Sequence, residues 1–327
     1  MKRKAFKGLL AAAAVFAGLG ALYGVRLLQR PSRIPVVRSL FQGITYERHV
    51  RDIPRPIIFH VVEIDLTAPG INFLVTPSRA NDDQREFAAD TVPGFVERHG
   101  VQVAVNGSYF FPQKVPVPPL IYFPRVGEGA DTMGVSISGG DRHSEAEEGW
   151  AALCIISVRD IQITPQDCPP ETQHGIAGDI QFVKDGAPYT DGLVLLKNST
   201  RLMPRSAIAL NKDTTKLWMV VLDGRQIGYS EGVTLAELGE ILIELGADRA
   251  LNLDGGGSST LAIEAEGAAQ ILNAPFQARV PMKLRPVANH LGVYALPLSD
   301  AVSDTGTHDA KETAMSDNHD GDSRHSH

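Results

Sequence analysis

Residues able to do chemistry gather in one stretch, Asp254-Gly-Gly-Gly-Ser-Ser-Thr260, which directly follows the short apolar run 250–253. The apolar run predicts a buried strand, so Asp254 stands where the chain leaves the sheet. Three consecutive glycines permit positive φ angles and close approach of other groups. Their N–H groups can also form a concave nest for an anion. A tight turn in which Asp254 caps its own loop amides is the structural alternative, but the combination favours a site.

A second aspartate occupies an equivalent position upstream. Asp223 ends the apolar run 216–222 and is followed by glycine and arginine. A helix is predicted over 234–245, where leucine and isoleucine recur at helical spacing. Thr234 as N-cap and Glu237 three residues later form a capping box at its start. The predicted order is therefore strand, loop, helix, strand.

Such a crossover makes its two strands parallel, and open α/β sheets bind ligands at the carboxyl ends of parallel strands. We therefore expect Asp223 and Asp254 to face a common cleft, with carboxyl groups within roughly 10 Å of each other. The loop after Asp223 overhangs that edge and carries Arg225 and Ser230. The candidate catalytic carboxylates are, in order, Asp254, Asp223, Glu231 and Asp179.

The other apolar runs predict an α+β or mixed α/β fold, a single large domain built on a mixed sheet. The crossover leads to the Gly-rich turn of that sheet. Runs 57–66 and 71–76, separated by turn residues, predict a hairpin. A helix interrupted at Pro93 is predicted over 87–99, and a strand over 205–210 that pairs with the strand ending at Asp223.

The two ends of the chain differ from the domain, which we place at 56–298. Residues 1–30 join a basic head to an apolar run, which predicts a secretory signal or membrane anchor. We favour an uncleaved anchor; a cleaved signal peptide and a buried core helix are the alternatives. Residues 31–55 form a linker, and the His- and Asp-rich stretch 299–327 predicts a disordered tail. The protein is thus expected to be exported, periplasmic or extracellular, and tethered to the inner membrane.

The amino-acid composition indicates a globular protein and gives no sign of nucleic-acid binding. The chain has 327 residues, of which 43% are hydrophobic, and a net charge of −7, which suits a globular core and does not indicate a nucleic-acid partner. Cys154 and Cys168 could pair in an oxidising compartment or remain one buried and one surface thiol. They lack the spacing of a zinc site. No cofactor is expected; a divalent metal is possible but not indicated.

Six segments resemble one family, the phosphodiester glycosidases, which carry the NAGPA domain. The resemblance covers roughly residues 59–296. It implies hydrolysis of a sugar-1-phosphodiester at the sugar carbon, as in N-acetylglucosamine-1-phosphodiester alpha-N-acetylglucosaminidase, here in a bacterial, exopolysaccharide-associated setting. The segments are Asn106-Gly-Ser-Tyr-Phe110, Arg205-Ser-Ala-Ile208, Asp223-Gly-Arg225, Ser230, Leu253-Asp-Gly-Gly-Gly-Ser258 and Val287-Ala-Asn289.

The residue types fit that chemistry without the family. A phosphodiester needs cations and amide donors, and the planar guanidinium group matches phosphate oxygens; surface ion pairs are the structural alternative for each arginine. Glycosidic cleavage uses carboxylates near the anomeric carbon, and arginines can stabilise the departing phosphate. The predicted substrate-binding residues are Asn106, Gly107, Tyr109, Arg205, Arg225, Ser230, Asn252, Gly255, Gly256, Gly257, Ser258, Arg285 and Asn289.

Two other functions remain open. A metal-dependent phosphodiesterase would cleave the P–O bond, but two-metal sites gather several carboxylates and histidines, whereas the acidic residues here are separated and lie among arginines. A non-catalytic protein could bind an anionic polysaccharide during export. The expected partners are a phosphorylated carbohydrate and, through the head, a membrane.

Overall fold

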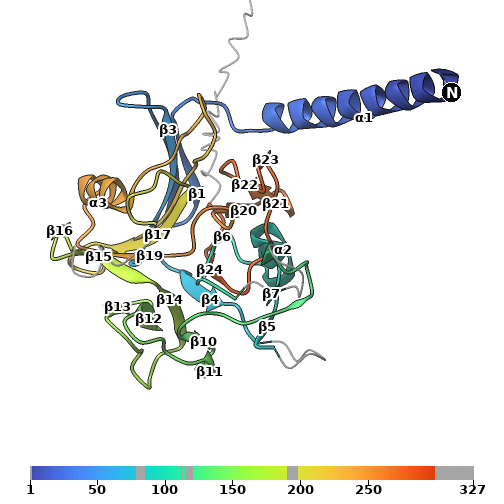
Figure 1. The fold of residues 1–327 in the computed structure, drawn as a ribbon. Coiled ribbons are helices and arrows are strands. Elements are labelled where there is room, and N and C mark those ends of the chain that lie inside the picture. The colour runs from blue at the N-terminus through green and yellow to red at the C-terminus, as the bar shows by residue number, and fades with distance from the viewer. Residues whose placement is uncertain (1, 79–84, 112, 115–120, 190–197, 299–327) are drawn as a thin grey trace, which may run out of the picture.

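The computed structural model describes residues 2–78, 85–111, 113–114, 121–189 and 198–298. Strands dominate this part of the chain (Figure 1). Its three helices are α1 (Lys2–Leu28), α2 (Val92–His99) and α3 (Leu235–Glu244). Every strand pairing between the described strands is antiparallel. The predicted α+β or mixed α/β class is therefore wrong: the domain is mainly β, with several antiparallel sheets.

The largest sheet has eight strands and carries the predicted crossover. Its spatial order is β1 (Val36–Phe41), β2 (Ile44–Arg51), β3 (Ile57–Asp65), β18 (Lys216–Leu222), β17 (Arg205–Leu210), β19 (Arg249–Asn252), β15 (Ile180–Lys184) and β16 (Ala187–Pro188).

The chain passes from β18 through α3 to β19, as predicted. β17 lies between these two strands and pairs antiparallel with both. β18 and β19 consequently run in the same direction without touching, which is why the sheet is not mixed. The α3 capping box is present: the Thr234 hydroxyl accepts from the Glu237 amide, and the Glu237 carboxylate accepts from the Thr234 amide.

Two five-stranded sheets and three two-stranded sheets complete the described part of the domain. The second sheet is ordered β21 (Ala268–Ile271), β20 (Leu261–Ala265), β6 (Val103–Asn106), β24 (His290–Tyr294) and β4 (Asn72–Val75). The third is ordered β11 (Asp141–Ser144), β10 (Ser136–Ser138), β14 (His174–Gly178), β12 (Ala151–Ser157) and β13 (Asp160–Thr164). The two-stranded sheets pair β5 (Phe87–Ala88) with β9 (Gly129–Ala130), β7 (Gln113–Lys114) with β8 (Ile121–Tyr122), and β22 (Phe276–Gln277) with β23 (Val280–Pro281).

All three large sheets share one hydrophobic core. Val221 of β18, Leu291 of β24 and Leu153 of β12 belong to the same buried cluster. A second cluster fills the opposite face of the eight-stranded sheet, where Leu238 and Leu242 of α3 pack. The eight-stranded sheet is therefore covered on both faces, which explains why its central strands read as continuous apolar runs.

Two local predictions are wrong for physical reasons. β3 and β4 do not form a hairpin, because β3 pairs with β2 and β18, and β4 pairs with β24 in another sheet. The helix predicted over 87–99 begins only at Val92, with Thr91 as N-cap and proline in its first turn. Proline fits there because the first-turn amides have no intrahelical acceptor.

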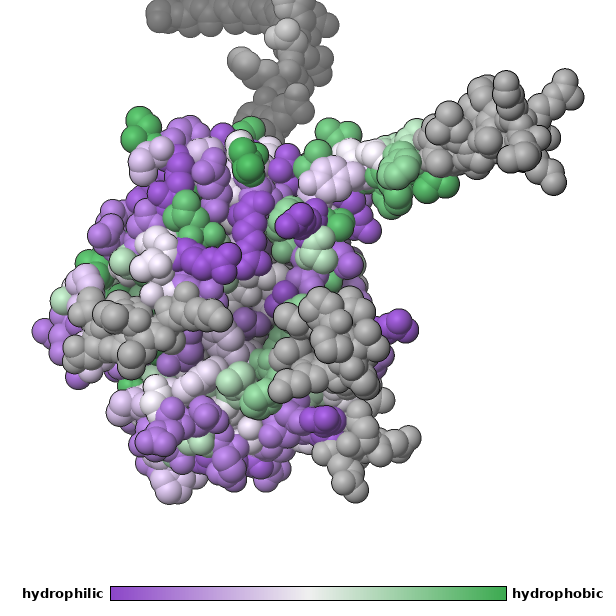
Figure 2. Space-filling view, viewed as in Figure 1, coloured by the Kyte–Doolittle hydropathy of each residue, from purple (hydrophilic) through white to green (hydrophobic). Residues whose placement is uncertain are grey.

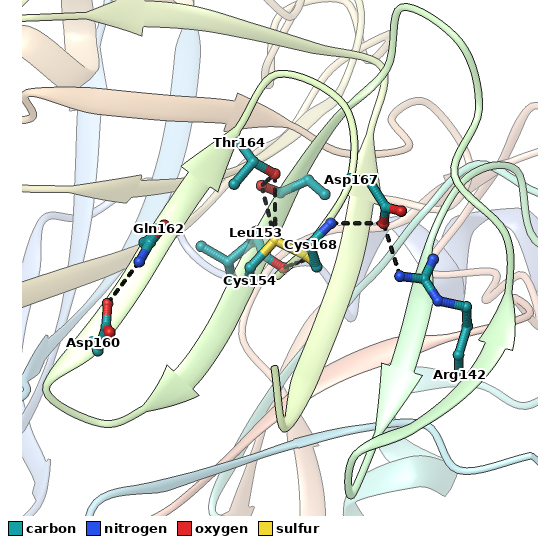
Figure 3. The surroundings of a disulfide bond; sticks show 9 residues. Arg142, Leu153, Cys154, Asp160, Gln162, Thr164, Asp167 and Cys168 are labelled. Atoms are coloured by element: carbon teal, nitrogen blue, oxygen red, sulfur yellow. Dashed lines mark hydrogen bonds and ion pairs between the residues drawn. A yellow bond between two sulfur atoms is a disulfide. The ribbon is translucent and has the colours of Figure 1, made fainter. Parts of the chain in front are cut away.

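Cys154 and Cys168 form a disulfide, which settles the pairing that the sequence left open. The bond joins β12 to the segment after β13, beside the ion pair between Arg142 and Asp167 (Figure 3). Small exported domains use such bonds because the thiols oxidise outside the cytoplasm.

The first helix projects from the domain (Figure 1). Phe16, Leu19, Leu22 and Leu28 of α1 are exposed, and apolar residues show in green on the coloured part of the arm next to the domain in Figure 2. None of the helices in the described part of the chain has the length and hydropathy needed to cross a bilayer.

Candidate active site

A cavity of about 290 Å³ lies at the edge of the eight-stranded sheet where β18 and β19 end and β15 and β17 begin. Two carboxyl groups, three guanidinium groups and a phenol line it. Its walls are Tyr109, Asp179, Asn198, Ser199, Met203, Arg205, Arg225, Leu235, Asp254, Gly255, Gly256, Gly257 and Arg285.

Asp254 reaches this cavity from the end of β19. Its carboxylate accepts a hydrogen bond from the Ser258 hydroxyl, and its backbone carbonyl accepts one from Asn106 Nδ2 at 2.6 Å. Burial raises the pKa of Asp254 to about 6. Arg285, the Ser258 hydroxyl and the Gly255 amide act against this rise in pKa. The carboxyl group is thus poised to titrate near neutral pH.

Asp179 is the second carboxyl group of the cavity and lies between β14 and β15. Asn252 Nδ2 donates to its Oδ1 at 2.7 Å and to the Tyr109 hydroxyl oxygen at 3.1 Å. Burial raises the pKa of Asp179 to about 6, and the charge of Asp254 adds to the rise. Both carboxyl groups of the cavity thus have a pKa raised mainly by burial, and the charge of Asp254 contributes least to the shift at Asp179.

The sequence placed Asp179 last among the candidate carboxylates, since it stands at the start of a predicted strand and has no glycine-rich turn after it. The antiparallel partnership of β15 with β19 sets Ile180 opposite Asn252. That pairing places Asp179 at the same edge of the sheet as Asp254. No local sequence pattern predicts which strand β15 pairs with.

Arg205 lies at the start of β17 and is almost fully buried. Its Nη2 donates to the carbonyl groups of Asn198 at 2.7 Å and Arg201 at 3.1 Å, and its Nε donates to that of Val233 at 3.3 Å. Arg205 therefore holds two chain segments at the cavity wall while adding a positive charge to it.

Arg285 is fixed on three sides. Its Nη1 donates to the Ser258 hydroxyl at 3.0 Å, and its Nε and Nη2 donate to Gln277 Oε1 at 3.1 and 2.6 Å. The guanidinium carbon lies 3.8 Å from the ring centroid of Phe123. A fixed cation beside Asp254 is well suited to hold an anionic group near that carboxylate.

Arg225 differs because its guanidinium group makes no hydrogen bond or ion pair with any residue that the structure describes. It is exposed, on a left-handed backbone with φ of 61°. Although the residue as a whole is exposed, partial burial of its guanidinium group at the cavity, followed by the charge of Arg201, lowers the pKa of Arg225. Its donors are thus available to a ligand in the cavity.

The Gly-rich turn brings these groups together. A Cβ on Gly256, whose φ is 66°, would stand 3.2 Å from the Arg225 guanidinium nitrogens. A Cβ on Gly257 would stand 1.9 Å from Gln277 Oε1. The Gly256 amide donates to the Pro204 carbonyl at 2.9 Å and so is not free for an anion. The glycines therefore leave room for both arginines, and the Gly256 amide is not part of the anion nest that the sequence suggested.

Asp223 does not line the cavity. Its Oδ1 accepts from the Ala274 amide at 2.8 Å and from Asn273 Nδ2 at 3.1 Å, while His60 Nε2 lies 3.2 Å from Oδ2. The side chain is buried among these donors. The expectation that it shares a cleft with Asp254 is wrong, since its carboxylate points into the interior instead.

The neighbours of Asp223 are structural as well. The Ser230 hydroxyl donates to the Asp223 carbonyl at 2.7 Å and accepts from the Ile58 amide at 3.0 Å. Glu231 uses its backbone, donating to the Pro56 carbonyl and accepting from the Arg225 amide. Neither side chain is among those lining the cavity.

Asn106, Gly107 and Asn289 lie behind the cavity wall. Asn106 Oδ1 accepts from the Ser206 hydroxyl at 2.8 Å, and Asn289 Oδ1 accepts from the Ser108 amide at 2.8 Å. A Cβ on Gly107 would stand 2.4 Å from Asn289 Oδ1. These residues join the second sheet to the turn that carries Asp254.

The donor set around the cavity suits an anion. Among the described residues, no three histidine, cysteine, aspartate or glutamate side chains converge in a way that could hold a metal. The cavity instead sets three guanidinium groups around two carboxyl groups, the arrangement expected for a phosphate ester next to an acid–base pair.

Comparison with known proteins agrees with this chemistry. The family model described as phosphodiester glycosidase matches residues 99–294. A prophage-derived uncharacterized protein of Bacillus subtilis, YomE, is 34% identical over 92 residues, or 28% of this chain and 14% of that protein.

Two solved structures show the same fold. A hypothetical protein from Synechocystis aligns with a TM-score of 0.60 and 16% identity, over 81% of this chain and 64% of that chain. The zebrafish N-acetylglucosamine-1-phosphodiester alpha-N-acetylglucosaminidase catalytic domain, auto-inhibited by its pro-peptide, aligns with a TM-score of 0.55 and 18% identity. That alignment covers 81% of this chain and 86% of the zebrafish chain.

Proposed function

Since this chain belongs to the phosphodiester glycosidase family, we propose that it hydrolyses a sugar-1-phosphodiester at the anomeric C–O bond. The products are the free sugar and a phosphomonoester. The observation that carries the proposal is one cavity in which Asp179 and Asp254, both with a raised pKa, lie beside the guanidinium group of Arg225, which pairs with none of the residues that the structure describes.

The arginines bind and stabilise the phosphate. Arg225 donates to its oxygens with groups that no described residue uses, and Arg285 stands fixed on the opposite side of the turn. Charge builds up on the phosphate as the C–O bond breaks, so cations held in place lower the barrier. A phosphomonoester leaves readily, and a strong general acid is unnecessary.

We propose different roles for the two carboxyl groups of the cavity, Asp254 and Asp179. Asp254 has Arg285 and the Ser258 hydroxyl beside it, both of which favour its charged form. We assign Asp254 as the carboxylate acting at the anomeric carbon. Asp179 takes the proton of the pair and, with Tyr109, orients the sugar through hydrogen bonds.

The proposed setting is the cell envelope, outside the cytoplasm. Two features support export: the basic and then apolar residues at the start of the chain, and the disulfide between Cys154 and Cys168. Disulfides persist in oxidising compartments, so the pair fits a periplasmic or extracellular enzyme acting on exopolysaccharide or envelope carbohydrate.

Product analysis tests the proposal. Purified protein is incubated with a panel of sugar-1-phosphodiesters, and the products are separated by chromatography. Release of free sugar in equal amount to a phosphomonoester is the expected result. Tight binding without any product would favour the non-catalytic polysaccharide-binding function instead.

A further inference from the structure

A second cavity, of about 400 Å³, adjoins the first. Arg285 lines both cavities and thus forms the wall between them. Gln277 also lines the second cavity, and its Oε1 holds Arg285 while lying against Gly257 of the first. A ligand longer than one sugar phosphate would pass from the first cavity into the second along the Arg285 side chain.

The second cavity is positively charged. Arg125 and Lys283 line it, both are exposed, and neither side chain makes an ion pair or hydrogen bond with any residue that the structure describes. Aspartate and glutamate are absent from its described lining residues. The Glu128 carboxylate, which lies near, is engaged by the backbone amide of Arg125 at 2.9 Å. This positive surface stands out on a protein whose net charge is −7.

Apolar groups complete the wall of the second cavity, and one of them holds Arg285 in place. The Phe123 ring stacks on the Arg285 guanidinium group at 3.8 Å, and Val126, Leu284 and Pro286 line the rest of the cavity. Such a surface matches an extended chain in which apolar carbon segments alternate with anionic groups. It offers nothing specific to a short, uncharged aglycone.

We propose that the second cavity is a subsite for the next anionic group of the substrate, so that the enzyme acts on a carbohydrate chain bearing repeated phosphodiesters. This inference rests on the proposed function, because it places the cleaved phosphodiester in the first cavity. Arg125 and Lys283 contact the following phosphate, and Arg285 lies between the two phosphates.

The experiment compares two synthetic substrates that share one sugar-1-phosphodiester. One carries a single phosphate, and the other carries a second phosphodiester one repeat further along the aglycone. The double variant Arg125→Gln/Lys283→Gln should raise the KM of the two-phosphate substrate about five- to thirtyfold, since it removes two exposed ionic contacts. The KM of the one-phosphate substrate should stay within about twofold, and added salt should reduce the wild-type preference.

Lys212→Gln is the matched control, because Lys212 is an exposed lysine on the turn between β17 and β18, away from both cavities. Equal kinetics for the two substrates with wild-type protein would overturn the inference. So would loss of binding to anionic lipid vesicles in the double variant without a change in two-phosphate kinetics.

The proposed function and the subsite can fail separately. If wild-type protein hydrolyses neither substrate, the proposed function fails, and calorimetry with a two-phosphate analogue bearing carbon in place of the anomeric oxygen decides the subsite. Weaker binding of that analogue by the double variant than by wild type supports the subsite. Equal binding overturns it.

Discussion

At the scale of single residues, the site is a balance between burial and charge. Asp254 and Asp179 are both partly buried at the cavity wall, and this burial raises each pKa to about 6. Arg285 and Arg225 act in the other direction on Asp254. This balance leaves the pair able to hold one proton near neutral pH, which a fully solvated carboxylate pair would not do.

Asp254→Asn tests the assigned role. The amide keeps the shape and can still accept from Ser258, but it removes the charge acting at the anomeric carbon. We expect kcat to fall at least about a thousandfold with an almost unchanged thermal melt. Asp223→Asn is the control: it disturbs three buried hydrogen bonds and should lower stability while folded protein keeps most of its activity. Normal turnover by Asp254→Asn would contradict the assignment.

Asp179→Asn should stabilise the protein at pH 8. The folded-state pKa of about 6 lies above the ordinary value of 3.8, so between these values the folded state binds more protons than the unfolded state. Stability therefore falls as pH rises through this window, and the loss reaches at most about 3 kcal/mol. The asparagine variant lacks this loss. Urea unfolding should show a stability gain at pH 8 that shrinks below pH 4; a variant less stable than wild type at pH 8 would contradict it.

The predicted site residues fall into two groups: those that neighbouring residues in the sequence identify, and those whose position depends on tertiary contacts. For Asp254 and the arginines, the neighbouring residues in the sequence already indicate a functional site. Glycines and charged residues are unfavourable in a hydrophobic core, so their presence next to a buried strand points to a function. Asp223 carries the same local signal, yet its carboxylate faces the interior donors of Asn273 and Ala274. The direction in which the Asp223 side chain points after the end of β18 is set by these partners. They lie far away in the sequence, so the local sequence pattern does not reveal them.

At the scale of elements, periodicity and capping predicted α3 correctly but not the partners of the strands. An apolar run states that a strand is buried and leaves open what it pairs with. β17 lies between β18 and β19 in the eight-stranded sheet. β3 pairs with β18 in that sheet, whereas β4 pairs with β24 in another sheet. The crossover was therefore predictable, and the all-antiparallel sheet was not.

A clamp at the end of α1 positions the loop that carries Arg225. The Arg30 guanidinium carbon lies 4.2 Å from the Tyr229 ring centroid, and its Nη1 donates to Gln226 Oε1 at 3.4 Å. The Tyr229 hydroxyl donates to the Pro31 carbonyl at 2.8 Å. Segments before the domain thus hold one side of the cavity.

Arg30→Ala should loosen this loop and raise KM about two- to fivefold, because it removes the cation–π contact with Tyr229 and two hydrogen bonds, to Gln226 Oε1 and to the Leu27 carbonyl. The kcat should change less than KM, since Arg30 touches no cavity residue. Arg33→Ala, which removes only an exposed ion pair with Asp52, is the matched control. If both variants bind substrate like wild type, the loop does not depend on the clamp.

At the scale of the whole molecule, three sheets meet around one core, and the site lies where the edges of two of them join. The turn after β19 reaches β6 of the second sheet through Asn106, while Arg285 approaches from the segment between β23 and β24. Groups from distant parts of the chain thus share one rigid edge, which keeps the guanidinium and carboxyl groups in register.

The most direct test of the central claim is hydrolysis in heavy-oxygen water. Cleavage of the anomeric C–O bond puts the solvent oxygen into the released sugar, and mass spectrometry of both products locates it. We predict label in the sugar and none in the phosphomonoester. Label in the phosphomonoester would mean attack at phosphorus, and the protein would then be a phosphodiesterase rather than a glycosidase.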